Sequence, residues 1–257
     1  MSDTGGRANE SSQHPQARGD AWPPEVSSAL RWVHDGQRLV EQTVAALDDD
    51  VRLPSALPGW SRGHVITHLA RNADALVNLL EWARTGNPAP MYSSRHQRDT
   101  EIEAGAERPL GEQAGDLAES GRRFAEAAAR LTEHGWSARV TSAQGRDIPA
   151  SEVPWMRTRE LWLHVLDLDA GVAMDDLPDD IAEALVRDVA SWMSSRIDTA
   201  IELRPHGHPP VRFGPAAETP SAVLSGPACR IAGWLTGRTS ANELHRDGVV
   251  PTLPRWL

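Results

Sequence analysis

Apolar residues recur at helical spacing along the first two-thirds of the chain. From residue 24 to about 46 they lie three, four or seven positions apart, which places them on one face of a helix: Val26, Leu30, Val33, Val40, Val44 and Leu47. A second helix is expected from a Ser61 cap to about Ala83, because a Pro-Gly segment precedes it and Gly86 and Pro88 follow it.

Two further helices complete this pattern. One is predicted from Leu110 to Glu133 and the other from Pro154 to Ala170, with Gly171 at its end. Residues 136–150, between them, are typical of a loop or a short strand pair, and residues 88–98 are expected to form a middle loop. Four helices connected in this way predict an up-down bundle.

The pattern changes after about residue 174. A helix is expected over residues 179–198, followed by short strands at 201–204 and 211–213 and by a helix that runs from Pro227 to Thr236. We therefore predict an α+β protein with three segments: a disordered leader at 1–23, a four-helix bundle at 24–174 and a smaller α+β domain at 175–257.

Composition narrows the classes of function. The formal net charge is -10 and the arginines form no basic block, which argues against nucleic-acid and anionic-membrane partners. No apolar run approaches the roughly 20 residues that span a bilayer, and residues 1–20 lack the apolar stretch of a signal peptide. Cys229 is the single cysteine, so no internal disulfide can form. These features predict a cytoplasmic protein, with a monomer slightly favoured over an oligomer.

A candidate metal site follows from the spacing of acidic and histidine residues. Glu160 and His164 lie four residues apart on the fourth helix, so both side chains can reach one ion, although such a pair alone is more typical of a solvated pair or a core histidine. The second helix carries His64 and His68 at the same spacing, and spacing does not choose between them. Two imidazoles and one carboxylate would leave a tetrahedral position open, as in catalytic zinc sites.

Several motifs, taken in order, resemble those of one family. The segment from Leu57 to Asp74 resembles the signature of the mycothiol-dependent maleylpyruvate isomerase family, which belongs to the DinB-like superfamily of metal-binding four-helix bundles. Residues 158–168 resemble the second metal segment of that family, and residues 91–99 resemble its middle loop. Residues 235–238 and the closing residues 253–257 resemble its C-terminal domain, so the resemblance covers about residues 25–257.

The resemblance implies a metal centre and two cofactors. Carried over position by position, the three metal ligands are His68, Glu160 and His164, and His64 is then not a ligand. The cofactors implied are zinc and the low-molecular-weight thiol mycothiol. Nitrogen and oxygen ligands also suit nickel, cobalt or iron, so the residues alone do not fix the metal.

The resemblance also implies a reaction, which is the cis–trans isomerisation of maleylpyruvate to fumarylpyruvate in gentisate breakdown. A zinc-bound thiolate adds to the double bond, the resulting single bond rotates, and elimination returns the thiol. Arg98 and Arg238 match arginines that the family uses near substrate and thiol, so both are candidate catalytic and cofactor-binding residues for a dicarboxylate substrate. The external thiol leaves Cys229 as a packed helix residue.

Two other functions remain open at this point. The same scaffold could carry a mycothiol S-transferase that acts on another electrophile, with the metal and the thiol unchanged. Alternatively, the chain could be a non-catalytic metal-binding protein with a DinB-like bundle. The two arginine matches favour a dianionic substrate over the first alternative, and thiol-dependent turnover would exclude the second.

Overall fold

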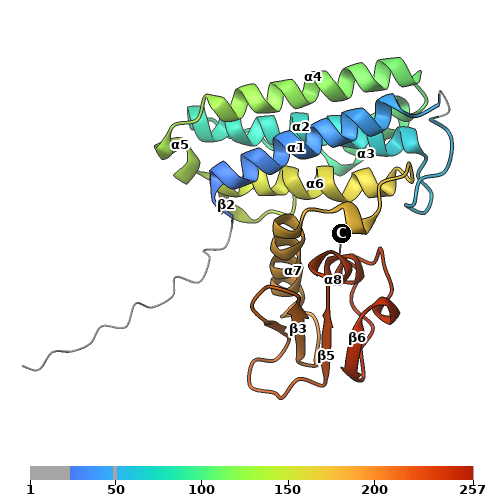
Figure 1. Ribbon diagram of the computed structural model, residues 1–257. Coiled ribbons are helices and arrows are strands. Elements are labelled where there is room, and N and C mark those ends of the chain that lie inside the picture. Colours follow the sequence, from blue (N-terminus) through green and yellow to red (C-terminus); the bar gives the residue numbers. More distant parts are fainter. Residues whose placement is uncertain (1–23, 49–50, 257) are drawn as a thin grey trace, which may run out of the picture.

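Four long helices form the bundle that the apolar periodicity predicts (Figure 1). The computed structural model describes residues 24–48 and 51–256, so the predicted leader at 1–23 lies outside the described residues. The bundle helices are α1 (Val26–Ala45), α2 (Arg62–Thr85), α4 (Leu110–Ala129) and α6 (Val153–Asp167). Helix α2 packs mainly against α4, and α1 mainly against α6. Helices α2 and α6 are also in contact, as a shared metal site requires.

Helix α2 has well-defined ends because of its flanking residues. The Ser61 hydroxyl accepts a hydrogen bond from the His64 backbone N–H, and the His64 ring accepts one from the Ser61 N–H, which together form a capping box. At the other end, Gly86 adopts the left-handed conformation with φ 75°, which a glycine takes without a side-chain clash. The predicted Ser61 cap is confirmed.

The region between α2 and α4 corrects the prediction of a loop. Residues Arg95–Ala106 form helix α3, which packs against α2, and the Ser94 hydroxyl caps it. Most of its side chains are exposed, and Ile102 is its one large apolar residue in the core, so the segment lacks the repeated apolar face by which the other helices are recognised. Arg98 therefore lies on a helix and not in a loop.

The third predicted helix ends four residues earlier than expected, and a short helix follows it. Helix α4 ends at Ala129, and a short helix α5 (Glu133–Ser137) begins after Thr132, whose hydroxyl accepts a hydrogen bond from the Gly135 N–H. The strand pair expected before the fourth helix is present as β1 (Arg139–Thr141) and β2 (Asp147–Pro149), which pair antiparallel. A single 3-10 turn, η1 (Ala150–Glu152), then leads into α6, three residues shorter than predicted at its end.

The C-terminal unit combines two helices with a mixed sheet (Figure 1). Helices α7 (Asp179–Met193) and α8 (Ala228–Leu235) pack against each other, and α7 is shorter than the predicted 179–198. The strand order is β4-β3-β5-β6, in which β3 and β5 are parallel and both outer strands are antiparallel to their neighbours. The strands are β3 (Ile201–Pro205), β4 (Val211–Phe213), β5 (Ala222–Gly226) and β6 (His245–Gly248), of which the last two were not predicted. The α+β fold class is confirmed.

One continuous apolar core runs through the bundle and the C-terminal unit. Of two further 3-10 turns, η2 (Met174–Asp176) lies between α6 and α7, and η3 (Ala241–Glu243) lies between α8 and β6. The chain end returns to the bundle, where Trp256 is buried and Arg159 of α6 lies over its ring at 5.7 Å. The division into domains at residue 175 stays a prediction. Across the described ranges, every helix is too short or too polar to cross a membrane.

Candidate functional site

The three ligands that the sequence suggests come together between α2 and α6. One ligand atom from each of His68, Glu160 and His164 lies within 4.8 Å of the other two. The His68 Nε2 is 2.8 Å from Glu160 Oε2, and the His164 Nε2 is 3.3 Å from the same oxygen. His68 is buried, whereas Glu160 and His164 are partly exposed on the same side. Residues 92 positions apart in sequence therefore present one convergent donor set.

A buried arginine helps to hold the two ligand-bearing helices in register. Arg157 of α6 is fully buried and donates hydrogen bonds to the Leu69 carbonyl and the Asn72 side chain of α2, at 2.7 and 3.0 Å. It also donates to the Gln37 side chain of α1 at 3.0 Å. Burial lowers the pKa of this guanidinium to about 10, yet it remains charged at neutral pH. Leu69 follows His68 directly, so these bonds fix α2 beside α6 at the level of the site.

The electrostatics of the site favour an ionised carboxylate beside a neutral imidazole. Burial alone would raise the pKa of Glu160, but hydrogen bonds from His164 and His68 outweigh it and hold that pKa well below its usual value. For His68, burial is the largest effect and lowers the pKa, and the attraction of Glu160 offsets it only in part. A charged carboxylate and a neutral imidazole are the forms that coordinate a metal ion.

The third member, His164, is held by a further acidic residue. Its Nδ1 lies 2.8 Å from the Asp167 carboxylate, one helical turn along α6. Burial alone would lower the pKa of His164, but the bonds to Asp167 and Glu160 raise it above the usual 6.5. Two nitrogens and one oxygen from two rigid helices fit a divalent transition-metal ion, and zinc, nickel, cobalt and iron all accept such ligands.

The triad lines a large pocket between the bundle and the C-terminal unit. Its volume is about 1000 Å³, and it extends from Trp60 and Tyr92 on the bundle side to Arg238 and Trp256 on the other. Among the described residues that line it, Glu160 is the one acidic side chain, against five arginines: Arg95, Arg98, Arg159, Arg238 and Arg255. Such a lining favours an anionic ligand.

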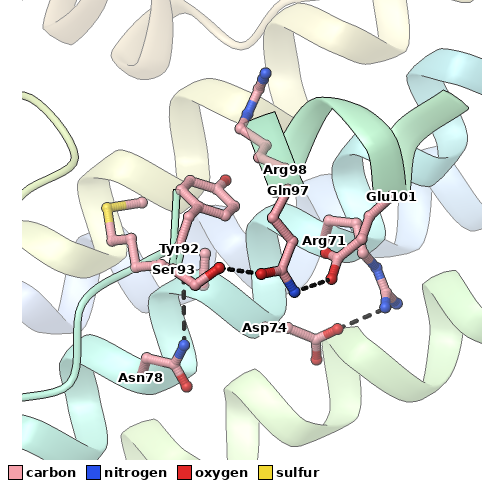
Figure 2. Close-up of a pocket in the computed structure, with 10 residues that line it drawn as sticks. Arg71, Asp74, Asn78, Tyr92, Ser93, Gln97, Arg98 and Glu101 are labelled. Carbon is pink, nitrogen blue, oxygen red and sulfur yellow. Dashed lines mark hydrogen bonds and ion pairs between the residues drawn. The ribbon is translucent and has the colours of Figure 1, made fainter. Parts of the chain in front are cut away.

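Arg98 of α3 lies directly beside the triad. Its Nη2 is 3.2 Å from the His68 Nδ1, and its guanidinium lies 5.8 Å from the centre of the Tyr92 ring. A neighbouring cavity of about 260 Å³ shares Tyr92 and Arg98 with the large pocket, and there the side chains of Ser93, Gln97 and Glu101 bond to one another (Figure 2). The side chain of Arg98 points away from these hydrogen-bonded residues, and Arg98 also lines the large pocket.

Arg238 reaches the site from the loop after α8. Its Nε and Nη2 bind the two oxygens of Asp167 at 3.0 and 2.5 Å, and its backbone N–H donates to the Gly233 carbonyl at 2.8 Å. Both arginines singled out from the sequence therefore line the pocket, on opposite parts of the chain. Arg98 touches one candidate ligand, whereas Arg238 touches the residue that holds another.

Two other candidates from the sequence lie outside the donor set. His64 caps the start of α2, and its Nε2 is 3.2 Å from a Glu103 oxygen. Of the two histidines of α2, it is therefore His68 that lies within reach of Glu160 and His164. Cys229 lies in α8 and is not among the residues that line the pocket. Burial and the nearby Asp175 raise the pKa of its thiol, so it is a poor nucleophile.

Sequence reasoning missed several residues that shape the site. Asp167 follows His164 by three positions, a spacing that could have indicated a supporting carboxylate. The tail residues Arg255 and Trp256 were recognised through the family motif, but nothing in their spacing indicates that they line the pocket. Arg157, which links α6 to α2, was also missed, because buried arginines without an acidic partner are rare.

Comparisons of sequence and of fold show which known proteins this chain resembles. The sequence model of the mycothiol maleylpyruvate isomerase N-terminal domain matches residues 33–169. The crystal structure of the mycothiol-dependent maleylpyruvate isomerase has a TM-score of 0.81 and 32% identity, over 90% of this chain and 97% of the other. The crystal structure of a histidine-to-alanine mutant of the mycothiol-dependent maleylpyruvate isomerase gives the same values. A search of the curated proteins finds no match.

A more distant structure supports the fold alone. YfiT from Bacillus subtilis, described as a probable metal-dependent hydrolase with an unusual four-helix bundle topology, has a TM-score of 0.50 and 13% identity. It covers 60% of this chain and 89% of its own length, in keeping with the predicted DinB-like bundle. The domain match and the near-complete overlap with a solved structure confirm the resemblance seen in the sequence: the chain belongs to the mycothiol-dependent maleylpyruvate isomerase family.

Proposed function

We propose that the chain is a mycothiol-dependent cis–trans isomerase that converts maleylpyruvate to fumarylpyruvate. The observation that carries this proposal is the position of the His68–Glu160–His164 triad in a pocket with five arginines and one acidic residue among its described lining. The substrate is a dianion, and the charge of this pocket complements it. Membership of the family supports the same reaction.

We propose zinc as the metal and His68, Glu160 and His164 as its ligands. Three protein ligands with one open position are typical of catalytic zinc sites. The ligands face a pocket and are not enclosed by the core, so an exogenous group can reach the fourth position. When bound, the metal supplies a Lewis acid that favours the thiolate form of the cofactor, whose reversible addition allows rotation about the former double bond.

The size of the pocket is consistent with two ligands bound together. Pockets for small molecules usually span about 300–1,000 Å³. This one, at about 1000 Å³, lies at the upper limit, although maleylpyruvate is a small molecule. The remaining volume leaves room for a larger thiol cofactor, as a bimolecular addition requires. Binding in one pocket would also hold the two reactants close together, which reduces the entropic cost of the reaction.

Arg98 and Arg238 are the proposed anion-binding residues. Arg98 touches His68, and Arg238 binds Asp167, which touches His164, so the two guanidiniums lie on either side of the triad. Arginine stays charged and offers several N–H donors to a carboxylate. Negative charge that develops on the substrate carbonyl oxygen during addition would be stabilised by the same groups. The protein needs no nucleophile of its own, in keeping with the position of Cys229 outside the pocket lining.

The wider assignments follow from the reaction and rest on the same proposal. The product belongs to gentisate breakdown, and we expect the enzyme in the cytoplasm, with a monomer slightly favoured over an oligomer. Its partners are then a small dicarboxylate and a low-molecular-weight thiol. The absence of a basic block in the sequence argues against nucleic acid as a partner.

The proposal is tested by measuring isomerisation of maleylpyruvate by zinc-loaded protein with and without mycothiol. Turnover is expected with both zinc and mycothiol present, and loss of turnover is expected when either is omitted. Restoring zinc after chelation should restore the rate. Equal rates with and without mycothiol would contradict the proposal, and so would thiol conjugation of other electrophiles without isomerisation.

A further inference from the structure

Asp167 links the metal-site histidine to the C-terminal unit through one buried carboxylate. It is the last residue of α6, and its side chain is 2% exposed. Its Oδ2 accepts hydrogen bonds from His164 Nδ1 at 2.8 Å and from Arg238 Nη2 at 2.5 Å. Its Oδ1 accepts one from Arg238 Nε at 3.0 Å. No other carboxylate in the described parts of the chain contacts both a ligand of the triad and a residue that follows α6.

The position of this carboxylate determines which ring nitrogen of His164 donates a hydrogen bond. Both carboxylate oxygens accept hydrogen bonds from the Arg238 guanidinium, which forms an ion pair with Asp167. An ionised carboxylate only accepts hydrogen bonds, so the facing Nδ1 of His164 must be the donor. The lone pair of Nε2 then points at the site shared with His68 and Glu160. A ligating histidine needs this tautomer.

Arg238 fixes the carboxylate in place from the other unit. It follows Gly237, which has φ 75°, and the backbone bond to Gly233 holds the loop against α8. Two N–H groups of one guanidinium bind the two Asp167 oxygens, which fixes the orientation of the carboxylate plane. A buried ion pair of this kind adds little net stability compared with apolar packing, but it holds both side chains in one geometry.

We propose that Asp167 is a positioning residue that sets the tautomer and orientation of His164, and that Arg238 acts on the metal site through Asp167. The docking of the C-terminal unit then contributes to metal affinity, although no metal ligand comes from that unit. The inference rests on the proposed metal site, but it concerns metal affinity and not the identity of the substrate.

The test compares the Zn²⁺ affinity of the full chain with that of Asp167→Asn, measured by competition with a chromophoric chelator. An amide places an N–H₂ group where the carboxylate accepts, so either His164 or Arg238 meets a donor. We expect affinity to fall about 10–100-fold, the usual effect of removing a carboxylate behind a ligating histidine. The visible spectrum of the Co²⁺-loaded variant should also change, because the geometry at His164 changes.

Asp188→Asn is the matched control. Asp188 lies on α7 and accepts hydrogen bonds from Arg159 and Trp155 of α6, so it also joins the two parts of the chain, but it touches no ligand. Its zinc affinity and Co²⁺ spectrum should match those of the wild type. Thermal unfolding of both variants would show that they remain folded.

A second variant, Arg238→Ala, separates the two steps of the inference. It should weaken zinc binding severalfold, and combining it with Asp167→Asn should add little further loss, because both act through His164. Wild-type zinc affinity and Co²⁺ spectra in Asp167→Asn would overturn the inference, whatever the isomerase assay shows. Equal losses in Asp167→Asn and Asp188→Asn would also overturn it. Wild-type protein that binds zinc normally but does not isomerise maleylpyruvate would contradict only the proposed function.

Discussion

The bundle and the C-terminal unit contribute to the pocket in different ways. In the bundle, the candidate ligands project from two rigid helices whose register is fixed by a buried Arg157. In the C-terminal unit, the contributing residues lie on a loop and on the chain end: Arg238, Arg255 and Trp256. Metal coordination tolerates displacements of only a few tenths of an ångström, whereas charge attraction acts over several ångströms. The difference suggests that α2 and α6 bind the metal, whereas the loop and chain end of the C-terminal unit, together with Arg98 of α3, bind the anion.

The strongest test of this division replaces the ligands one at a time. His68→Ala, Glu160→Ala and His164→Ala should each remove bound zinc and abolish turnover, because two remaining ligands cannot hold a catalytic ion. Zinc content of the purified variants measures this directly. His64→Ala is the control, since His64 caps α2 and should leave most of the zinc in place. A site emptied only by His64→Ala would reverse the ligand assignment.

The second-largest expected effect is the loss of turnover when either of the two arginines is replaced. Arg98→Ala and Arg238→Ala should each lower turnover by about 10²–10³, the usual cost of removing a donor that stabilises developing negative charge. Lysine at either position should rescue poorly, because it keeps the charge but loses the planar set of donors. Steady-state kinetics at saturating zinc, with metal content measured in the same samples, separates substrate binding from metal loss. Wild-type rates in both would reduce these arginines to ordinary ion-pairing residues.

A smaller effect is expected from pH. The pKa of His164 is raised above 6.5. A proton therefore competes with the metal for this imidazole as the pH falls through the raised pKa. Zinc affinity should therefore decrease with falling pH, by about tenfold per unit below the raised pKa if one proton is displaced. The pKa of Glu160 is lowered, so its carboxylate should add no dependence in this range. Zinc affinity that stays constant as the pH falls through the raised pKa of His164 would contradict the assignment of His164 as a ligand.

The smallest expected effect is that of the cysteine. Cys229→Ser should retain near wild-type turnover, because the thiol lies outside the pocket lining and its pKa is raised. The assay with maleylpyruvate and mycothiol measures it. Loss of turnover in a folded, zinc-loaded variant would show that the protein supplies the nucleophile and would contradict a mechanism with an external thiol.

The bundle was predictable from sequence because its helices bury repeated apolar faces. Local sequence features also predicted details of these helices correctly. Ser61 caps α2, Gly86 ends it, and Glu160 lies beside His164 in the structure. Helix α3 escaped prediction because its side chains are mostly polar and exposed, and β5 and β6 are short strands defined by pairing with distant residues. Local patterns thus predicted elements with a continuous buried face, and missed those that depend on tertiary contacts.

The candidate site shows the same limit. Spacing brought Glu160 and His164 together, but only the packing of α2 against α6 distinguishes His68 from His64. Asp167 and Arg238 lie 71 positions apart, so no local spacing reveals the contact between them. Family resemblance supplied the two arginines, and the structure adds that Arg98 contacts His68, whereas Arg238 contacts Asp167, which in turn contacts His164.

We propose above that the thiol cofactor binds at the metal held by His68, Glu160 and His164. Zinc-edge X-ray absorption of the loaded protein, before and after addition of mycothiol, tests it most directly. Before addition, the account predicts only nitrogen and oxygen neighbours; after addition, it predicts one sulfur neighbour at about 2.3 Å. The His164→Ala variant should show no such change. A zinc environment that mycothiol leaves unaltered, in protein that still isomerises maleylpyruvate, would contradict the account.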